Sequence, residues 1–168
     1  TFFSKGIVSH IGCAQPVCPD LCANIYSAGR ALNLNMHKGG TYINMEGPQF
    51  STLVESKLYL SWGMDVIGMT NMAEARLCRE AEICYCTLAC VTDYDCWHPE
   101  HESVTLDMIM NNLKKNKILS LVIKNLPAQG SCACKDTLKY AIITYKKLIP
   151  AKIKKDLDII IGKYVNGK

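Results

Sequence analysis

Two carboxylates, Asp93 and Asp95, stand two residues apart just after the long apolar run of residues 83–91. A run of that length that ends abruptly in polar residues is typical of a buried strand in a parallel sheet. Ligands of open α/β sheets bind beyond the carboxyl ends of the strands. If the extended backbone continues through Tyr94, both carboxylates lie on the same side of it. We therefore interpret the pair as a candidate site, with a helix cap or a solvated turn as the alternatives.

Such a pair has a specific chemical use. Crowded carboxylates tend to share a proton, which leaves one neutral donor beside one charged acceptor. That combination suits a ligand edge with a lone pair next to an N–H group, as adenine presents at N7 and its amino group. The spacing of the two residues is compatible with purine recognition and also with a polar turn.

The residues before this pair predict the elements that position it. Residues 64–69 read as a second apolar strand, a helix follows to about residue 82, and residues 83–91 form the next strand. A helical crossover of that length implies two parallel strands in one sheet. Their carboxyl ends would then bring Met69 and Thr70 to the same edge as the carboxylates.

The rest of the chain reads as alternating helices and short strands. A capping-box pattern of Thr52 and Glu55 follows a Gly-Pro turn and marks the start of a helix that Gly63 closes. Hydrophobic periodicity predicts further elements: a strand at residues 41–45, helices at 19–32, 104–116, 135–144 and 150–162, and a short strand at 118–123.

Composition restricts the class of protein. With 168 residues, 49% of them apolar and 20% charged, the chain has room for one globular domain, residues 1–168. No apolar stretch reaches the roughly 20 residues of a membrane span, so we expect no membrane partner. The net charge of +4 comes largely from residues 114–117 and 152–155. No aromatic residues interleave these patches, which argues against a nucleic-acid partner.

The ten cysteines are mixed into the expected helices and strands. A secreted disulfide framework would place them in loops, so we expect a reducing, cytoplasmic setting. Cys18 and Cys22 could face each other on a helix, but no second ligand pair lies at zinc-site spacing, and we interpret them as core residues. Cys132 and Cys134 form a tight pair in a Gly-Ser loop, for which a redox role is an alternative.

Three ordered motifs, at residues 46–52, 65–75 and 92–97, resemble the methylthioadenosine phosphorylases, in the trimeric branch of the purine nucleoside phosphorylase family. The similarity covers nearly the whole chain. It implies a partial nucleoside-phosphorylase-like α/β fold, with a mixed central sheet flanked by helices, in a homotrimer. It also implies a pentosyltransferase of purine and methionine salvage, which converts 5′-methylthioadenosine and phosphate to adenine and 5-methylthioribose 1-phosphate. Inorganic phosphate is the co-substrate, and no metal or organic cofactor is implied.

The resemblance also assigns roles to residues. The carboxylates that match Asp93 and Asp95 hold the purine N7 and amino group, and protonation at N7 makes the base a better leaving group. Phe50 matches a residue that packs on the base, and Thr70 matches a hydroxyl that binds phosphate. The other implied substrate contacts are Ser51 near the base, Met69 at the ribose, Ile67, Leu106 and Ile109 around the base and methylthio group, and His10 near the 5′ substituent.

We expect the chain to be the C-terminal portion of such an enzyme. Family members carry roughly a hundred residues ahead of the matching segment, including most of the phosphate site. Two alternatives remain open. The substrate could be methylthioinosine or a general purine nucleoside. In a different class, the chain could be a non-catalytic nucleoside-binding or oligomer-forming fragment.

Overall fold

The computed structural model describes residues 1–99, 106–113, 116–128, 130 and 132–166. Contacts between its residues divide the chain into two compact units. Unit 1 consists of Thr1–Cys22, Met72–Thr87 and Gln129–Lys168, and unit 2 consists of Ala23–Asn71 and Leu88–Ala128. The single domain that the sequence predicts over residues 1–168 stays a prediction.

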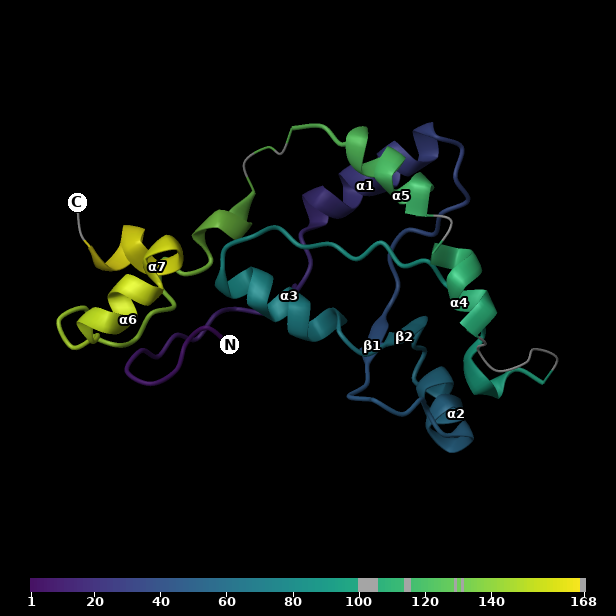
Figure 1. The fold of residues 1–168 in the computed structure, drawn as a ribbon, viewed down its shortest axis with the longest axis horizontal. Coiled ribbons are helices and arrows are strands. Elements are labelled where there is room, and N and C mark those ends of the chain that lie inside the picture. Colours follow the sequence, from purple (N-terminus) through teal and green to yellow (C-terminus); the bar gives the residue numbers. More distant parts are fainter. Residues whose placement is uncertain (100–105, 114–115, 129, 131, 167–168) are drawn as a thin grey trace. The chain divides into compact units, whose positions relative to one another are not determined.

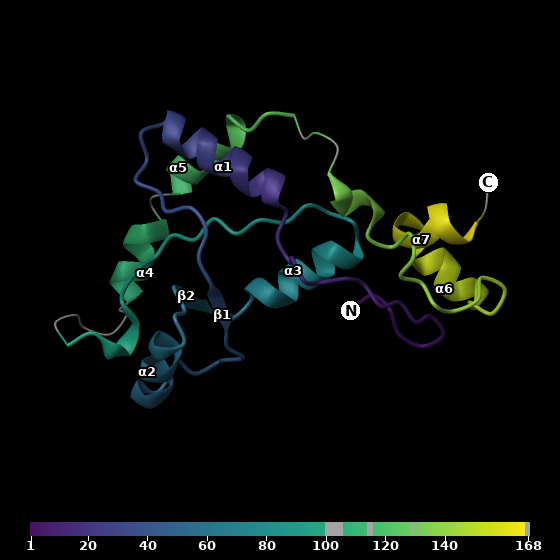
Figure 2. The ribbon, with the colours of Figure 1, turned by 180° about the vertical axis from the view of Figure 1, so that it is seen from behind.

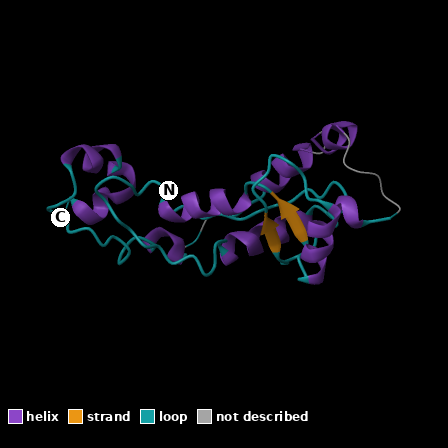
Figure 3. Cartoon of the chain, turned by 90° about the horizontal axis from the view of Figure 1, so that it is seen from below, coloured by secondary structure: helices purple, strands orange, loops and turns teal. Residues whose placement is uncertain are grey.

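Helices predominate over strands in the described residues (Figures 1 and 3). None of these helices combines the length and apolar character that crossing a bilayer requires. In chain order the elements are α1 (Pro19–Ala31), β1 (Tyr42–Asn44), α2 (Leu53–Ser61), β2 (Val66–Gly68), α3 (Asn71–Glu80), η1 (Asp95–Trp97), α4 (Leu106–Leu113), α5 (Asn116–Lys124), η2 (Ala133–Asp136), α6 (Ala151–Asp156) and α7 (Asp158–Val165).

A parallel pair of short strands organises unit 2. β1 and β2 pair in the register Tyr42 with Val66, Ile43 with Ile67 and Asn44 with Gly68. Helix α2 is the connection between them and lies beside the pair in both Figure 1 and Figure 2. The strands expected at residues 41–45 and 64–69 are therefore confirmed, and each is shorter than expected by one or two residues at either end.

Helix α2 begins with the capping box that the sequence predicts. The Thr52 backbone N–H donates to the Glu55 carboxylate at 2.7 Å, and the Glu55 N–H donates to the Thr52 hydroxyl at 3.3 Å. The backbone and side-chain hydrogen bonds from Thr52 lower the pKa of Glu55 from its usual value of 4.5. Its stabilising contribution is therefore complete above pH 4.5 and is lost as the pH falls through the lower folded value.

The strand expected at residues 83–91 is wrong. Residues 83–94 have no regular secondary structure, and Val91 is 67% exposed. A strand needs a neighbour that pairs with its N–H and C=O groups in succession. Within the described residues, the Cys18 N–H donates to the Tyr85 carbonyl at 2.7 Å, but no succession of such bonds forms a ladder along this run. The partner of β2 is β1, and the expected pairing of β2 with residues 83–91 is also wrong.

Tertiary contacts also override two other expectations. The helix expected at residues 135–144 is reduced to η2 and turns, because the Ala141 carbonyl accepts from His10 N–H and the Ile143 N–H donates to Val8, each at 2.9 Å. The strand expected at residues 118–123 is helix α5. Short apolar runs fit either period, and here Val122 is buried on one helical face.

The remaining helices match their expected segments. α1 and α3 lie within residues 19–32 and 70–82, and α4 lies within residues 104–116. The segment expected as one helix at residues 150–162 is two helices, α6 and α7, because the backbone leaves helical geometry at Leu157, where φ is −105° and ψ is 13°.

The core of unit 1 joins its first and last segments. Six buried residues form it: Ile7, Leu138, Ala141, Ile149, Ile161 and Val165. Burying a valine, leucine or isoleucine side chain contributes roughly 1.5–3 kcal/mol, and Ala141 contributes less. The core therefore fixes α7 against the N-terminal segment.

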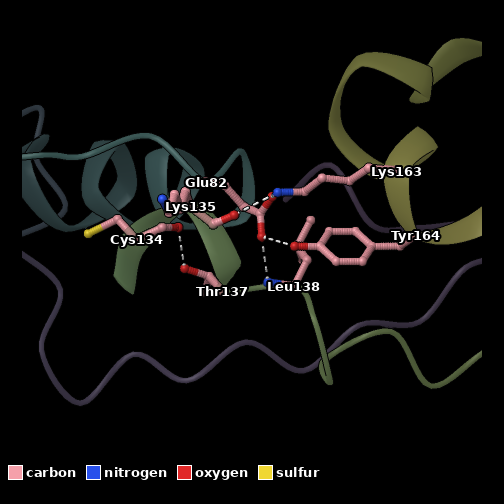
Figure 4. A network of polar contacts seen from close by, with 7 residues as sticks. All are labelled: Glu82, Cys134, Lys135, Thr137, Leu138, Lys163 and Tyr164. Atoms are coloured by element: carbon pink, nitrogen blue, oxygen red, sulfur yellow. Dashed lines mark hydrogen bonds and ion pairs between the residues drawn. The ribbon is translucent and has the colours of Figure 1, made fainter. Parts of the chain in front are cut away.

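Glu82 ties the end of α3 to the C-terminal segment. It has a positive φ of 58°, and the Ile83 N–H donates to the Cys78 carbonyl at 2.8 Å, as in a Schellman C-cap. Its carboxylate accepts from the Tyr164 hydroxyl at 2.6 Å and the Leu138 N–H at 2.9 Å, and pairs with Lys163 at 2.6 Å (Figure 4). This network fixes the direction of the chain where α3 ends.

We expect Glu82→Gln to lower the free energy of unfolding by about 1–3 kcal/mol, because a buried charged acceptor of two hydrogen bonds becomes a neutral amide. Urea unfolding measures the change. Lys163→Met is the matched control. Its side chain is 52% exposed, so losing the ion pair alone should cost less than about 1 kcal/mol. Equal losses in the two variants would contradict this assignment.

Candidate active site

Asp93 and Asp95 are joined by a tight polar turn. The Asp95 backbone N–H donates to Asp93 Oδ1 at 2.8 Å, and the Thr92 hydroxyl donates to Asp93 Oδ2. A side chain that accepts from the N–H two residues later is an Asx turn. Each carboxylate oxygen accepts up to two hydrogen bonds. These contacts therefore orient the Asp93 carboxylate and leave it able to accept from a ligand.

The two carboxylates are brought together by this turn and not by a strand. Tyr94 has φ −99° and ψ 18°, and Asp95 has a φ of 59°, in the left-handed region. The expectation that an extended backbone places both residues on one side is therefore wrong. Asp is one of the few residues that adopt this conformation, and it is strained relative to ordinary backbone. Strain of this kind persists where surrounding contacts hold the residue and is frequent at functional sites.

Helix α2 supplies the contact that holds Asp95. The Ser56 hydroxyl donates to Asp95 Oδ2 at 2.7 Å, and Ser56 is 1% exposed. A second contact runs beside it, because the Cys96 thiol donates to the Ser51 carbonyl at 3.5 Å. The start of α2 and the start of η1 are thereby held together by two side-chain contacts.

The end of β2 lies against the segment that leads into α2. Asn44 donates from Nδ2 to the Met69 carbonyl at 3.1 Å, and the Met45 N–H donates to the Gly68 carbonyl at 2.9 Å. Gly47 has a φ of 76°, and a Cβ on it would lie 2.5 Å from Met69 Sδ. A side chain at this position would be strained by the backbone and would displace the Met69 thioether, so Gly47 allows the Met69 side chain to lie against the turn.

The segment around Ser51 connects these contacts into one group. The Ser51 hydroxyl donates to Met45 Sδ at 3.7 Å, while its carbonyl accepts from Cys96. The structure therefore links four of the residues that the sequence singles out: Ser51, Met69, Asp93 and Asp95. Their common position follows from the β1–β2 pairing and the α2–η1 contacts.

Other predicted site residues lie near this group in the chain but outside its hydrogen bonds. Phe50 is 67% exposed next to Ser51, Thr70 is exposed directly after Met69, and Ile67 is half-buried in β2 opposite Ile43. Leu106 begins α4 and is 79% exposed. The side chain of Ile109 lies outside the described residues.

His10 belongs to unit 1, whereas the other predicted site residues belong to unit 2. Its side chain is exposed, and its backbone N–H donates to the Ala141 carbonyl at 2.9 Å. A hollow of about 140 Å³ in the same unit is lined by Leu138, Ile142 and Tyr164. It is smaller than the pockets of roughly 300–1,000 Å³ that hold small-molecule ligands.

Sequence reasoning missed Ser56, Cys96 and Asn44. Ser56 is a small polar residue three positions before Tyr59, on the covered side of α2. A polar residue on the covered side of a helix needs a partner, and that signal could have found it. The sulfur contact of Cys96 and the amide contact of Asn44 depend on tertiary placement and leave no such signal.

The sequence of this chain matches the model of the Phosphorylase superfamily over residues 1–124. That match spans most of the chain and includes the β1–α2–β2 unit, the carboxylate turn and α4. The chain therefore belongs to the Phosphorylase superfamily.

Within this superfamily, the chain is similar in sequence to proteins that share one name. It is 51% identical over 170 residues to the S-methyl-5′-thioadenosine phosphorylase of Geobacter sulfurreducens, covering 98% of this chain and 59% of that protein. It is 52% identical over 174 residues to the protein of the same name from Thermosynechococcus vestitus, covering 98% of this chain and 60% of the relative. The chain thus spans about three-fifths of the length of the relatives it matches.

Solved structures agree with this placement. A methylthioadenosine phosphorylase from an Antarctic soil metagenomic library is 39% identical, with a TM-score of 0.85 over 95% of this chain and 58% of that one. The methylthioadenosine phosphorylase of Schistosoma mansoni in complex with adenine is 28% identical, with a TM-score of 0.72 over 83% of this chain and 58% of that one. The expected α/β class and the partial nucleoside-phosphorylase-like fold are confirmed.

We expect Ser56→Ala to lower the free energy of unfolding by about 1–3 kcal/mol, because the part-buried Asp95 carboxylate loses a hydrogen-bond donor. Ser61→Ala on the same helix is the control. The Ser61 hydroxyl donates to the Leu58 carbonyl on an exposed surface, so its loss should cost less than about 0.5 kcal/mol. The interpretation fails if urea unfolding finds the two variants equally stable.

Proposed function

We propose that the whole protein to which this chain belongs catalyses the phosphorolysis of 5′-methylthioadenosine to adenine and 5-methylthioribose 1-phosphate, and that this chain carries the base and ribose contacts. The carboxylate turn of Asp93 and Asp95, held by Thr92 and Ser56, carries this proposal. It lies in a chain of the Phosphorylase superfamily whose relatives bear the name of that activity. Inorganic phosphate is the co-substrate, and the proposed reaction draws on no organic cofactor or metal.

In the proposed reaction a phosphate oxygen forms a bond to the anomeric carbon of the sugar as the bond from that carbon to purine N9 breaks. The electron pair of the broken bond goes to the purine, and a proton delivered to N7 neutralises the developing charge. One carboxyl of the Asp93–Asp95 pair carries that proton, and the other accepts from the 6-amino group. Because the Asx turn fixes their separation, little reorganisation is needed at the moment of reaction.

The other roles are proposed on the same basis. Phe50 packs on the base, and its exposed ring, next to Ser51 in the chain, is available for such a contact. Met69 contacts the ribose, and the Thr70 hydroxyl binds phosphate. The apolar residues Ile67, Leu106 and Ile109 line the base and methylthio group, and His10 lies near the 5′ substituent.

A 6-amino purine is the proposed substrate class. Two acid side chains can offer a proton to N7 and a charged acceptor to an amino group, whereas a 6-oxo purine presents a carbonyl oxygen at that position. Faster phosphorolysis of methylthioinosine than of methylthioadenosine would overturn this preference.

We further propose a homotrimer that works in the cytoplasm, where ten free cysteines would stay reduced. Helix α2 supports association, because it exposes several large apolar side chains: Leu53, Val54, Leu58 and Leu60. We expect analytical ultracentrifugation of the whole protein to give three times the mass of its own chain. A monomer at micromolar concentration would contradict that expectation.

We expect Asp93→Asn to lower kcat/KM for methylthioadenosine by about 100-fold or more, because an amide cannot deliver the proton to N7. Adenine release, followed with and without phosphate, measures the rate and tests its dependence on phosphate. Adenine affinity, measured by calorimetry, should fall about tenfold or more through the lost charged hydrogen bond.

Asp156→Asn, an exposed substitution on α6, is the control and should leave both quantities unchanged. Unchanged turnover in Asp93→Asn would remove Asp93 from the mechanism. A protein that binds adenine without phosphate-dependent release would instead favour the non-catalytic nucleoside-binding alternative.

A further inference from the structure

Four cysteines converge in unit 1: Cys18, Cys84, Cys132 and Cys134. Their sulfur atoms all lie within 4.8 Å of one another. They come from the three separate segments that make up this unit. Cys18 and Cys134 are buried, at 1% and 5% exposure, and the other two are half-buried. The carboxylates of the proposed active site are not part of this group.

The local structure explains why the sulfur atoms meet. Cys18 stands directly before α1, and its N–H donates to the Tyr85 carbonyl at 2.7 Å, next to Cys84. Cys132 precedes η2, and Cys134 lies within it, so the tight helical turn directs both side chains to the same place. The Thr137 hydroxyl holds this turn by donating to the Cys134 carbonyl at 2.8 Å.

The spacing fits a tetrahedral metal ion. With metal–sulfur bonds of about 2.3 Å, the sulfur atoms of a tetrahedral four-thiolate zinc site lie about 3.8 Å apart. The sulfur atoms of Cys84 and Cys132 are 3.0 Å apart, and the outer limit of the group is 4.8 Å. Movements of less than about 1 Å per side chain would reach the ideal geometry.

A cation stands beside the group. Arg79 donates from Nη1 to Cys134 Sγ at 3.7 Å, and its Nε donates to the Gly12 carbonyl at 3.2 Å, which fixes the guanidinium. A divalent ion with four thiolates has a net charge of −2, and a fixed guanidinium offsets part of it. Arg79 is therefore placed to support metal-bound thiolates.

We propose that Cys18, Cys84, Cys132 and Cys134 bind one structural zinc ion that links the three segments of unit 1. Zinc is the metal that four thiolates in a closed tetrahedral site select most directly. The ion would take no part in the proposed reaction, and the inference stands independently of the proposed function. A disulfide between Cys84 and Cys132 would use only two of the four sulfurs and leave two thiols buried beside it.

The first test is the metal content of the 168-residue chain, purified under reducing conditions from cells supplied with zinc. We expect one zinc per chain by elemental mass spectrometry. Replacing zinc by Co²⁺ should give thiolate-to-metal charge-transfer bands and the intense visible bands of tetrahedral cobalt. Because these spectra are recorded on the unaltered chain, the test does not depend on the folding of any variant.

Variants then assign the ligands. Cys18→Ser and Cys134→Ser should each lower zinc affinity at least 100-fold, while Cys90→Ser, an exposed residue outside the group, should leave it unchanged. Arg79→Met should weaken binding about 10- to 100-fold as a supporting contact. Arg76→Met, an exposed change on the same helix, should have no effect.

Three results would overturn the proposal. The chain could be free of zinc and fail to give the cobalt spectrum. Peptide mapping without reduction could find a Cys84–Cys132 disulfide in freshly purified protein. Bound cobalt could keep its spectrum in both the Cys18→Ser and the Cys134→Ser chains, which would place the metal elsewhere.

Discussion

Three residue pairs of β1 and β2 hold together segments that lie more than twenty positions apart in the sequence. Their parallel pairing requires a crossover, and α2 provides it. Because the strands are short, the crossover places the turn before α2 and the end of β2 side by side, where Asn44 reaches the Met69 carbonyl. The proposed ribose and base contacts meet only as long as this pairing holds.

The carboxylate turn depends on that frame through α2. Ser56 is buried because α2 packs on η1, and its hydroxyl meets an aspartate whose backbone is left-handed. A strained residue is held in place when several contacts fix it together. Here the Asx turn, the hydrogen bond from the Ser56 hydroxyl and that from the Cys96 thiol together hold Asp95 in this conformation. Preorganisation of this kind is what a proton donor to a purine base requires.

Unit 1 is held together by an apolar core and a buried carboxylate instead of by strand pairing. Its apolar core joins the N-terminal segment to α7, and the buried carboxylate of Glu82 collects donors from Leu138 and Tyr164. The four cysteines of the sulfur group come from the three segments that make up unit 1 and meet away from this apolar core. The apolar run after Glu82 contributes Cys84 to this sulfur group, and its backbone forms no strand among the described residues.

Sequence alone determined the local features and the chemical class. The capping box of Thr52, the glycine at position 47 and the paired aspartates are set by short-range rules of side-chain hydrogen bonding and backbone freedom, and three ordered motifs indicated the family. Tertiary structure decided which segments pair. It made residues 118–123 a helix, left residues 83–91 irregular, and brought Cys18 to Cys134. Burial of apolar side chains is favourable in any backbone geometry, so apolar composition does not distinguish a helix, a strand or a loop. Strand pairing and sulfur clustering depend on partners far away in the chain.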